Sequence, residues 1–211
     1  MLEQIINDIF DYLINKFICF NSLINLSCTC KYFYYNIYIT DLLNVKNKYL
    51  DKLTDVILMQ PKYVYVRFLN ANDNCKITTV NHMTKLENLA AEYRCGINDD
   101  GIRNINLKVL NASYNSKITM VNHMTRLEKL WAGYSCGIND EGIRNINLKM
   151  LCATNNSKIT TVNHMTKLEE LWAGFKECGI NDEGIMGINL KILNAICNSK
   201  ITVTKRVGKI K

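Results

Sequence analysis

The sequence predicts an α/β fold in which a solenoid of about seven coils follows a small module of three helices. One observation is a long segment, Lys76–Ser116, that recurs almost verbatim as Lys117–Ser157 and, with one extra residue, as Lys158–Ser199. Another is that the pattern L-x-x-L-x-A divides each copy into alternating units of about 20 and about 21 residues. A unit this short cannot bury its apolar face alone, so neighbouring units must stack to form a core.

Each unit contains one predicted strand. Its fourth and sixth positions are apolar and alternate with polar or aromatic residues, which is typical of a strand with one buried face. The units start at Val66, Leu86, Leu107, Leu127, Leu148, Leu168 and Leu190. This pattern resembles the leucine-rich-repeat (LRR) family through about two-thirds of the chain.

The ninth position of alternate units is an asparagine, and these residues are Asn74, Asn115, Asn156 and Asn198. The resemblance implies that this side chain turns inward and pairs with backbone groups at the end of the strand. Intervening units carry Cys95, Cys136 and Cys178, each followed by Gly-Ile-Asn-Asp. This resembles the cysteine-containing repeats of F-box proteins, but the spacing C-x-I departs from them and leaves the position of the sulfur open.

The N-terminal segment, 1–40, carries three apolar clusters, the first of them on helical spacing. So many apolar residues in so small a module suggest that it docks on another molecule. The run Ile9-Phe10-Asp11-Tyr12-Leu13, followed by Leu23, Leu26, Thr29, Cys30, Lys31 and Phe33, resembles an F-box. It departs from that motif by Met1-Leu2 in place of Leu-Pro, by Gln4 in place of Glu, and by a longer gap before Leu23. The alternative is a helical N-terminal cap for the solenoid.

The expected domains are therefore an F-box-like module at 1–40, a linker or N-terminal cap at 41–65, and a solenoid with an incomplete last repeat at 66–211. The F-box/LRR resemblance implies a substrate-recognition subunit of a cullin–RING ubiquitin ligase. Its contacts to a Skp1-type adaptor would be Ile9, Phe10, Leu13, Leu23, Leu26, Cys30 and Phe33. The alternative is an LRR protein-interaction scaffold with no role in ubiquitin transfer.

The expected target-binding surface is the concave sheet face, because outward strand positions form columns along a solenoid. The residues expected to contact an unknown target protein are Trp131, Trp172, Tyr93, Tyr114, Tyr134, Phe175 and Met150. Exposed aromatic residues at the centre of an interface are typical binding anchors. The alternative is that duplication copied a tryptophan that only packs against its neighbouring unit.

Other functions are not expected. His82, His123 and His164 lie two coils apart, at least ~9.5 Å in a stack of strands, which is too far to share one zinc ion. No activated nucleophile or phosphate loop is found, so no enzyme activity, metal or cofactor is predicted. The net charge is +7, but the tail Lys200–Lys211 holds five basic groups and no acid, which makes nucleic-acid binding through this tail a weak rival.

Localisation follows from the same features. Nine cysteines without a signal peptide, and no apolar stretch long enough to span a bilayer, indicate a cytoplasmic or nuclear protein with reduced thiols. The abundance of Asn, Ile and Lys, together with near-identical repeats, resembles F-box/LRR proteins of large DNA viruses of protists. In that case the host-cell cytoplasm would be the location and host ubiquitin machinery the partner.

Overall fold

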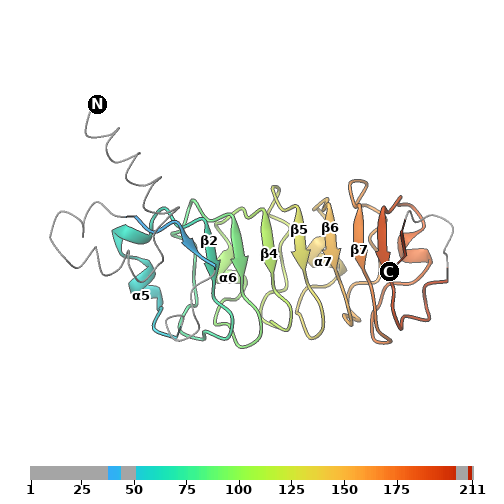
Figure 1. Cartoon of the computed structure of the whole chain (residues 1–211), viewed down its shortest axis with the longest axis horizontal. Coiled ribbons are helices and arrows are strands. Elements are labelled where there is room, and N and C mark those ends of the chain that lie inside the picture. The colour runs from blue at the N-terminus through green and yellow to red at the C-terminus, as the bar shows by residue number, and fades with distance from the viewer. Residues whose placement is uncertain (1–37, 44–50, 203–208, 211) are drawn as a thin grey trace, which may run out of the picture.

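A computed structural model describes residues 38–43, 51–202 and 209–210. Within these ranges the chain winds into a parallel β-solenoid whose nine short strands pair in chain order, from β1 to β9 (Figure 1). The strands are β1 Asp41–Leu42, β2 Phe68–Asn70, β3 Asn88–Ala90, β4 Val109–Asn111, β5 Lys129–Trp131, β6 Met150–Cys152, β7 Glu170–Trp172, β8 Ile192–Asn194 and β9 Lys209–Ile210. The predicted stack of parallel coils is confirmed.

Short helical turns occupy the side of the coils opposite the sheet (Figure 1). In the described part of the chain they are α5 Asp55–Leu58, η1 Pro61–Tyr63, α6 Asp99–Ile102, α7 Asp140–Ile143 and η2 Glu183–Ile185. The last three fall in alternate coils, in the segments that begin Gly-Ile-Asn-Asp. The sheet extends into the region expected as linker or cap, because β1 pairs with β2. Residues 1–37 of the expected F-box-like module, 1–40, lie outside the described residues.

The core lies between the sheet and the helical side. Equivalent leucines pair across neighbouring strands, as Leu130 with Leu151 and Leu151 with Leu171, so the same position is buried in every coil. The alanine two residues further on is also fully buried in the coils from β2 to β7, while Ala195 after β8 is partly buried. A continuous apolar core therefore replaces the separate cores that coils this small cannot build.

In every second coil, a buried asparagine just after the strand forms hydrogen bonds with backbone groups. The Nδ2 of Asn156 donates to the carbonyl oxygens of Ala132 and Ile138 at 2.7 and 3.1 Å. Its Oδ1 accepts from the backbone N–H of Lys158 at 2.9 Å. Asn115 and Asn198 make the equivalent bonds. The inward role expected for this asparagine is confirmed.

The recurring Asn-Asp pair organises the helical side. The Oδ1 of Asn98 accepts from the N–H of Gly101 and caps α6. The neighbouring Asp99 binds the next coil, since it accepts from the backbone N–H of Thr119 at 2.8 Å and from its hydroxyl at 2.6 Å. Asp140 makes the same pair of contacts to Thr160. Asn98 thus caps the helix, and Asp99 holds the following coil in position by hydrogen bonds.

Candidate functional site

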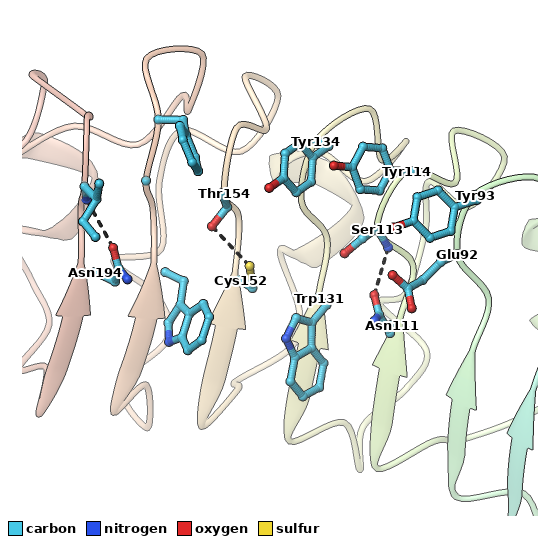
Figure 2. A pocket seen from close by; sticks show the side chains of 14 residues that line it. Glu92, Tyr93, Asn111, Ser113, Tyr114, Trp131, Tyr134, Cys152, Thr154 and Asn194 are labelled. Carbon is cyan, nitrogen blue, oxygen red and sulfur yellow. Dashed lines mark hydrogen bonds between the residues drawn. The ribbon is translucent and has the colours of Figure 1, made fainter. Parts of the chain in front are cut away.

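The fifth position of each coil points away from the core and forms a column along the sheet. Trp131 on β5, Cys152 on β6 and Trp172 on β7 are adjacent in this column. Figure 2 labels Trp131 and Cys152 on this face, and the strand register places Trp172 on the other side of Cys152. Trp172 is 42% exposed and Trp131 is partly buried. The prediction that both tryptophans face away from the core is confirmed.

Met150 does not belong to the open surface. It occupies an outward position of β6 but is only 7% exposed, as is Cys152. Its register neighbours are Lys129 on β5 and Glu170 on β7, and Cys152 lies between the two tryptophans. Because neighbouring strands are only about 4.8 Å apart, long side chains on both sides cover the central one. The expectation that Met150 offers an accessible contact to a target is corrected on this point.

A rim of aromatic residues borders this column just beyond the ends of the strands. Tyr93, Tyr114, Tyr134 and Phe175 share the eighth position of their coils (Figure 2 labels the three tyrosines). The rings of Tyr93 and Tyr114 stack with centroids 4.8 Å apart, and those of Tyr114 and Tyr134 with centroids 4.2 Å apart. Tyr93 and Phe175 are both exposed. The predicted rim residues therefore lie beside the tryptophans.

The rim backbone is left-handed in every coil from β2 to β8. The φ angles of Tyr93, Tyr114, Tyr134 and Phe175 lie between 55° and 68°. Asparagine and aspartate adopt this conformation more readily than bulky residues, and Asn155 and Asp73 do so here. Aromatic side chains at four such positions add strain of about 1 kcal/mol each, which ring stacking offsets among the tyrosines.

Two ionisable groups at this surface have shifted pKa values. Desolvation, together with hydrogen bonding to Tyr134, raises the pKa of Tyr114 to about 12, so its hydroxyl stays protonated at neutral pH. Partial burial raises the pKa of Glu92, and hydrogen bonds from Asn72 and Asn111 oppose that shift. The Nδ2 of Asn72 donates to Oε1 of Glu92 at 2.8 Å.

The column and the rim enclose a shallow depression of about 430 Å³. Its walls include Trp131, Trp172, the three stacked tyrosines and Phe175, with Glu92 at one end and Ile196 at the other. This brings together every residue predicted for target binding except Met150. The sequence pattern did not single out Glu92, since nothing in the repeat marks its partial burial.

A row of alternating charges runs along the second position of the coils. It consists of Arg67, Glu87, Lys108, Glu128, Lys149, Glu169 and Lys191. Glu87 pairs with Arg67 and Lys108, Glu128 with Lys149, and Glu169 with Lys191, all at 2.8 to 3.0 Å. Mostly exposed ion pairs such as these contribute little to the stability of the fold. Each glutamate of the row has a basic partner within the row.

The histidines and acidic groups do not form a metal site in the part of the chain that the structure describes. His123 and His164 each place Nε2 at 3.0 Å from a carbonyl of the preceding helical turn, Ile102 and Ile143. They therefore lie on the helical side, away from the aromatic depression. Among the same residues, no helix has the length and apolar character needed to cross a membrane.

The repeat cysteines are core residues. Cys95, Cys136 and Cys178 are fully buried, and burial raises the pKa of Cys95 and of Cys136 to about 11. Thiols held in this state are neutral at physiological pH and poorly nucleophilic. The structure thus places the sulfur, which the C-x-I spacing left open, inside the solenoid.

We expect brief alkylation of the native protein at pH 7.5 to modify exposed Cys75 and Cys197 and to spare the three buried repeat cysteines. Peptide mass spectrometry after iodoacetamide treatment measures this directly. Rapid labelling of Cys136 in folded protein would contradict the placement of its thiol in the core, and labelling in urea supplies the control.

The predicted adaptor contacts and most of the basic tail lie outside the described residues. The adaptor set comprises Ile9, Phe10, Leu13, Leu23, Leu26, Cys30 and Phe33, and the tail residues concerned are 203–208 and 211. These interpretations stay predictions from the sequence.

The fold defines the class of the molecule as a parallel β-solenoid, and its repeat pattern resembles that of leucine-rich repeats. No protein-family model matches the sequence, and no curated protein matches it. The crystal structure of an internalin (inlF) from Listeria monocytogenes is similar, with a TM-score of 0.41 and 16% sequence identity. The match covers 80% of this chain and 57% of the internalin chain, less than two-thirds of the latter. The class assignment itself rests on the repeats and the sheet.

Proposed function

We propose that the chain is a binding protein that holds a protein partner against the aromatic depression on its sheet face. The observation that carries this proposal is the joint exposure of Trp172, Phe175 and Tyr93 around one depression. Exposed aromatic clusters on a rigid scaffold mark interaction sites, because large rings bury much area at little cost in side-chain entropy. The core needs none of these three side chains.

Replacing Trp172 and Phe175 together by alanine should weaken partner binding by more than about 30-fold, the loss expected from a single central aromatic anchor that contributes about 2 kcal/mol. Affinity purification from the native host cell with wild-type and double-variant bait, followed by titration of the proteins lost, measures the effect. Met186→Ala is the matched control, because Met186 is also an exposed apolar residue but follows η2 on the helical side. Partners lost with Met186→Ala, or retained by the double variant, would contradict the proposal.

A finer role is favoured by the order of the sequence motifs, with the F-box-like segment directly before the repeats. In this role residues 1–40 bind a Skp1-type adaptor of a cullin–RING ligase, and the depression holds the protein to be ubiquitinated. The chain would then contribute proximity, because two binding surfaces in one molecule raise the local concentration of the target near the ubiquitin carrier. The work would take place in the cytoplasm or nucleus.

Substituting Leu13 and Leu26 by aspartate is expected to abolish capture of a Skp1-type protein, because charges would replace apolar contact residues. Asn36→Asp, outside the motif residues, is the control and should leave capture unchanged. Unchanged capture by the double variant, or no capture by the wild type, would contradict the ubiquitin-ligase role. The interaction-scaffold function would then be the one that remains.

A further inference from the structure

The depression has an unusual charge for a protein whose sequence carries a net +7. Among the described residues that line it, Glu92 supplies the one formal charge at neutral pH, and no lysine or arginine is present. The remaining walls are mainly aromatic rings with neutral polar groups between them. Aromatic faces carry a negative electrostatic potential, which attracts cations. The depression is therefore an acidic and electron-rich patch on a basic protein.

Glu92 differs from the glutamates of the charge row. Glu87, Glu128 and Glu169 each pair with a basic side chain. In the described part of the chain Glu92 has only the neutral amides of Asn72 and Asn111 as side-chain partners. Its backbone N–H also donates to Oδ1 of Asn72 at 2.9 Å, which fixes the residue in place. A partly buried carboxylate held by amides is unbalanced, and a cation from outside would balance it.

The two tryptophans offer a second place for a cation. Trp131 and Trp172 lie two strands apart, about 9.6 Å along the stack, with the small Cys152 between them (Figure 2). Cys152 is only 7% exposed but lines the depression together with both indoles, so the space over it is a shallow notch in which one side chain from a partner can lie. A lysine or arginine there would lie close to two indole faces, and tryptophan is the ring that attracts cations most strongly.

The distance between these two places can be spanned by two side chains of an extended peptide. Glu92 follows β3, and the space between the tryptophans lies over β6, about 14 Å across the strands and about 7 Å along them, or about 16 Å in all, and the reach of a long basic side chain covers the excess over the peptide spacing that follows. In an extended peptide, residues i and i+4 face the same side and lie about 13 Å apart. A segment running across the strands can thus present one basic side chain to each place.

Building on the proposed function, we propose that the partner presents an extended segment with basic residues four positions apart, one pairing with Glu92 and the other entering between Trp131 and Trp172. The Tyr93, Tyr114 and Tyr134 rim lies beside the first of these places and supplies an apolar wall for the stem of that side chain. The positive net charge of the whole protein disfavours general attraction of basic peptides, so the affinity must come from this patch.

The test uses the full chain and a short fluorescein-labelled peptide, in which two arginines at i and i+4 stand in a Gly/Ser background. Fluorescence anisotropy at 50 mM salt should show saturable binding that weakens about tenfold in both Glu92→Gln and Trp172→Leu. Glu128→Gln removes the same charge from the charge row and should change affinity less than twofold. A peptide with the two arginines adjacent should bind about fivefold more weakly.

Equal losses in Glu92→Gln and Glu128→Gln, equal binding of the two arginine spacings, or no binding to 1 mM protein would overturn the basic-segment proposal. Preferential binding of an acidic peptide or of a neutral oligosaccharide to the same surface would overturn it as well. None of these results touches the proposed function, which fails separately if the Trp172→Ala, Phe175→Ala variant keeps its partners.

Discussion

Asn156→Ala is expected to lower the free energy of unfolding by about 4 kcal/mol. The side chain is 1% exposed and is the partner of three backbone groups, two carbonyls and one N–H. Alanine leaves these groups without a partner inside the solenoid, and each unpaired buried group costs about 1–3 kcal/mol. Urea unfolding followed by circular dichroism measures the change.

Asn147→Ala is the matched control for this variant. Asn147 also makes two hydrogen bonds to the next coil. Its Nδ2 donates to the hydroxyl of Thr166, and its Oδ1 accepts from the backbone N–H of Lys167. It is exposed, so water replaces the lost partners and the expected cost is below about 1 kcal/mol. Similar losses in the two variants would show that the inward asparagines do not hold the coils closed.

Gly137→Ala should destabilise the protein by about 3 kcal/mol through overpacking between coils. A Cβ atom at this position would lie 2.5 Å from the carbonyl oxygen of Ser116 and 2.6 Å from that of Ile118. Both atoms are backbone atoms of the preceding coil, so relief requires the two coils to separate. Gly96 and Gly179 meet their preceding coils in the same way. Thermal unfolding followed by circular dichroism reports the loss.

Gly187→Ala separates this close contact from a general effect of losing glycine. A Cβ there would be 3.5 Å from its nearest neighbour, in ordinary contact, and the backbone φ of Gly187 is not positive. Alanine should therefore keep or slightly raise stability, by up to about 1 kcal/mol. A Gly137→Ala protein as stable as Gly187→Ala would refute the close approach of neighbouring coils.

The repeat predicts most of the fold because stacking translates one sequence position into one structural position. Leu151, Ala153 and Asn156 lie where their place in the unit puts them, and Trp131 and Trp172 face outward for the same reason. Periodicity defines the face that a residue occupies but not the size of its neighbours on adjacent strands. The burial of outward-facing Met150 between Lys129 and Glu170 therefore escaped the sequence pattern.

The positive φ angles of the rim residues also could not be predicted from the sequence. Tyrosine and phenylalanine are poor indicators of positive φ, and the asparagine and aspartate that do favour it occupy the same position in only two coils from β2 to β8. Glu92 was missed because the repeat has no second glutamate at the seventh position with which to compare it. Its partial burial depends on Asn72 and Asn111, which belong to two different neighbouring coils.

The binding surface requires that Trp172 faces solvent on the sheet while the coils pack behind it. The most direct measurement is acrylamide quenching of the Trp131→Phe variant, in which Trp172 is the one remaining tryptophan of the sequence. We expect efficient quenching of Trp172 in the folded protein, approaching that in urea, and weaker quenching of Trp131 in Trp172→Phe. If Trp172 is instead shielded in the folded, partner-free protein, it lies inside a closed core, and the proposed binding surface does not exist.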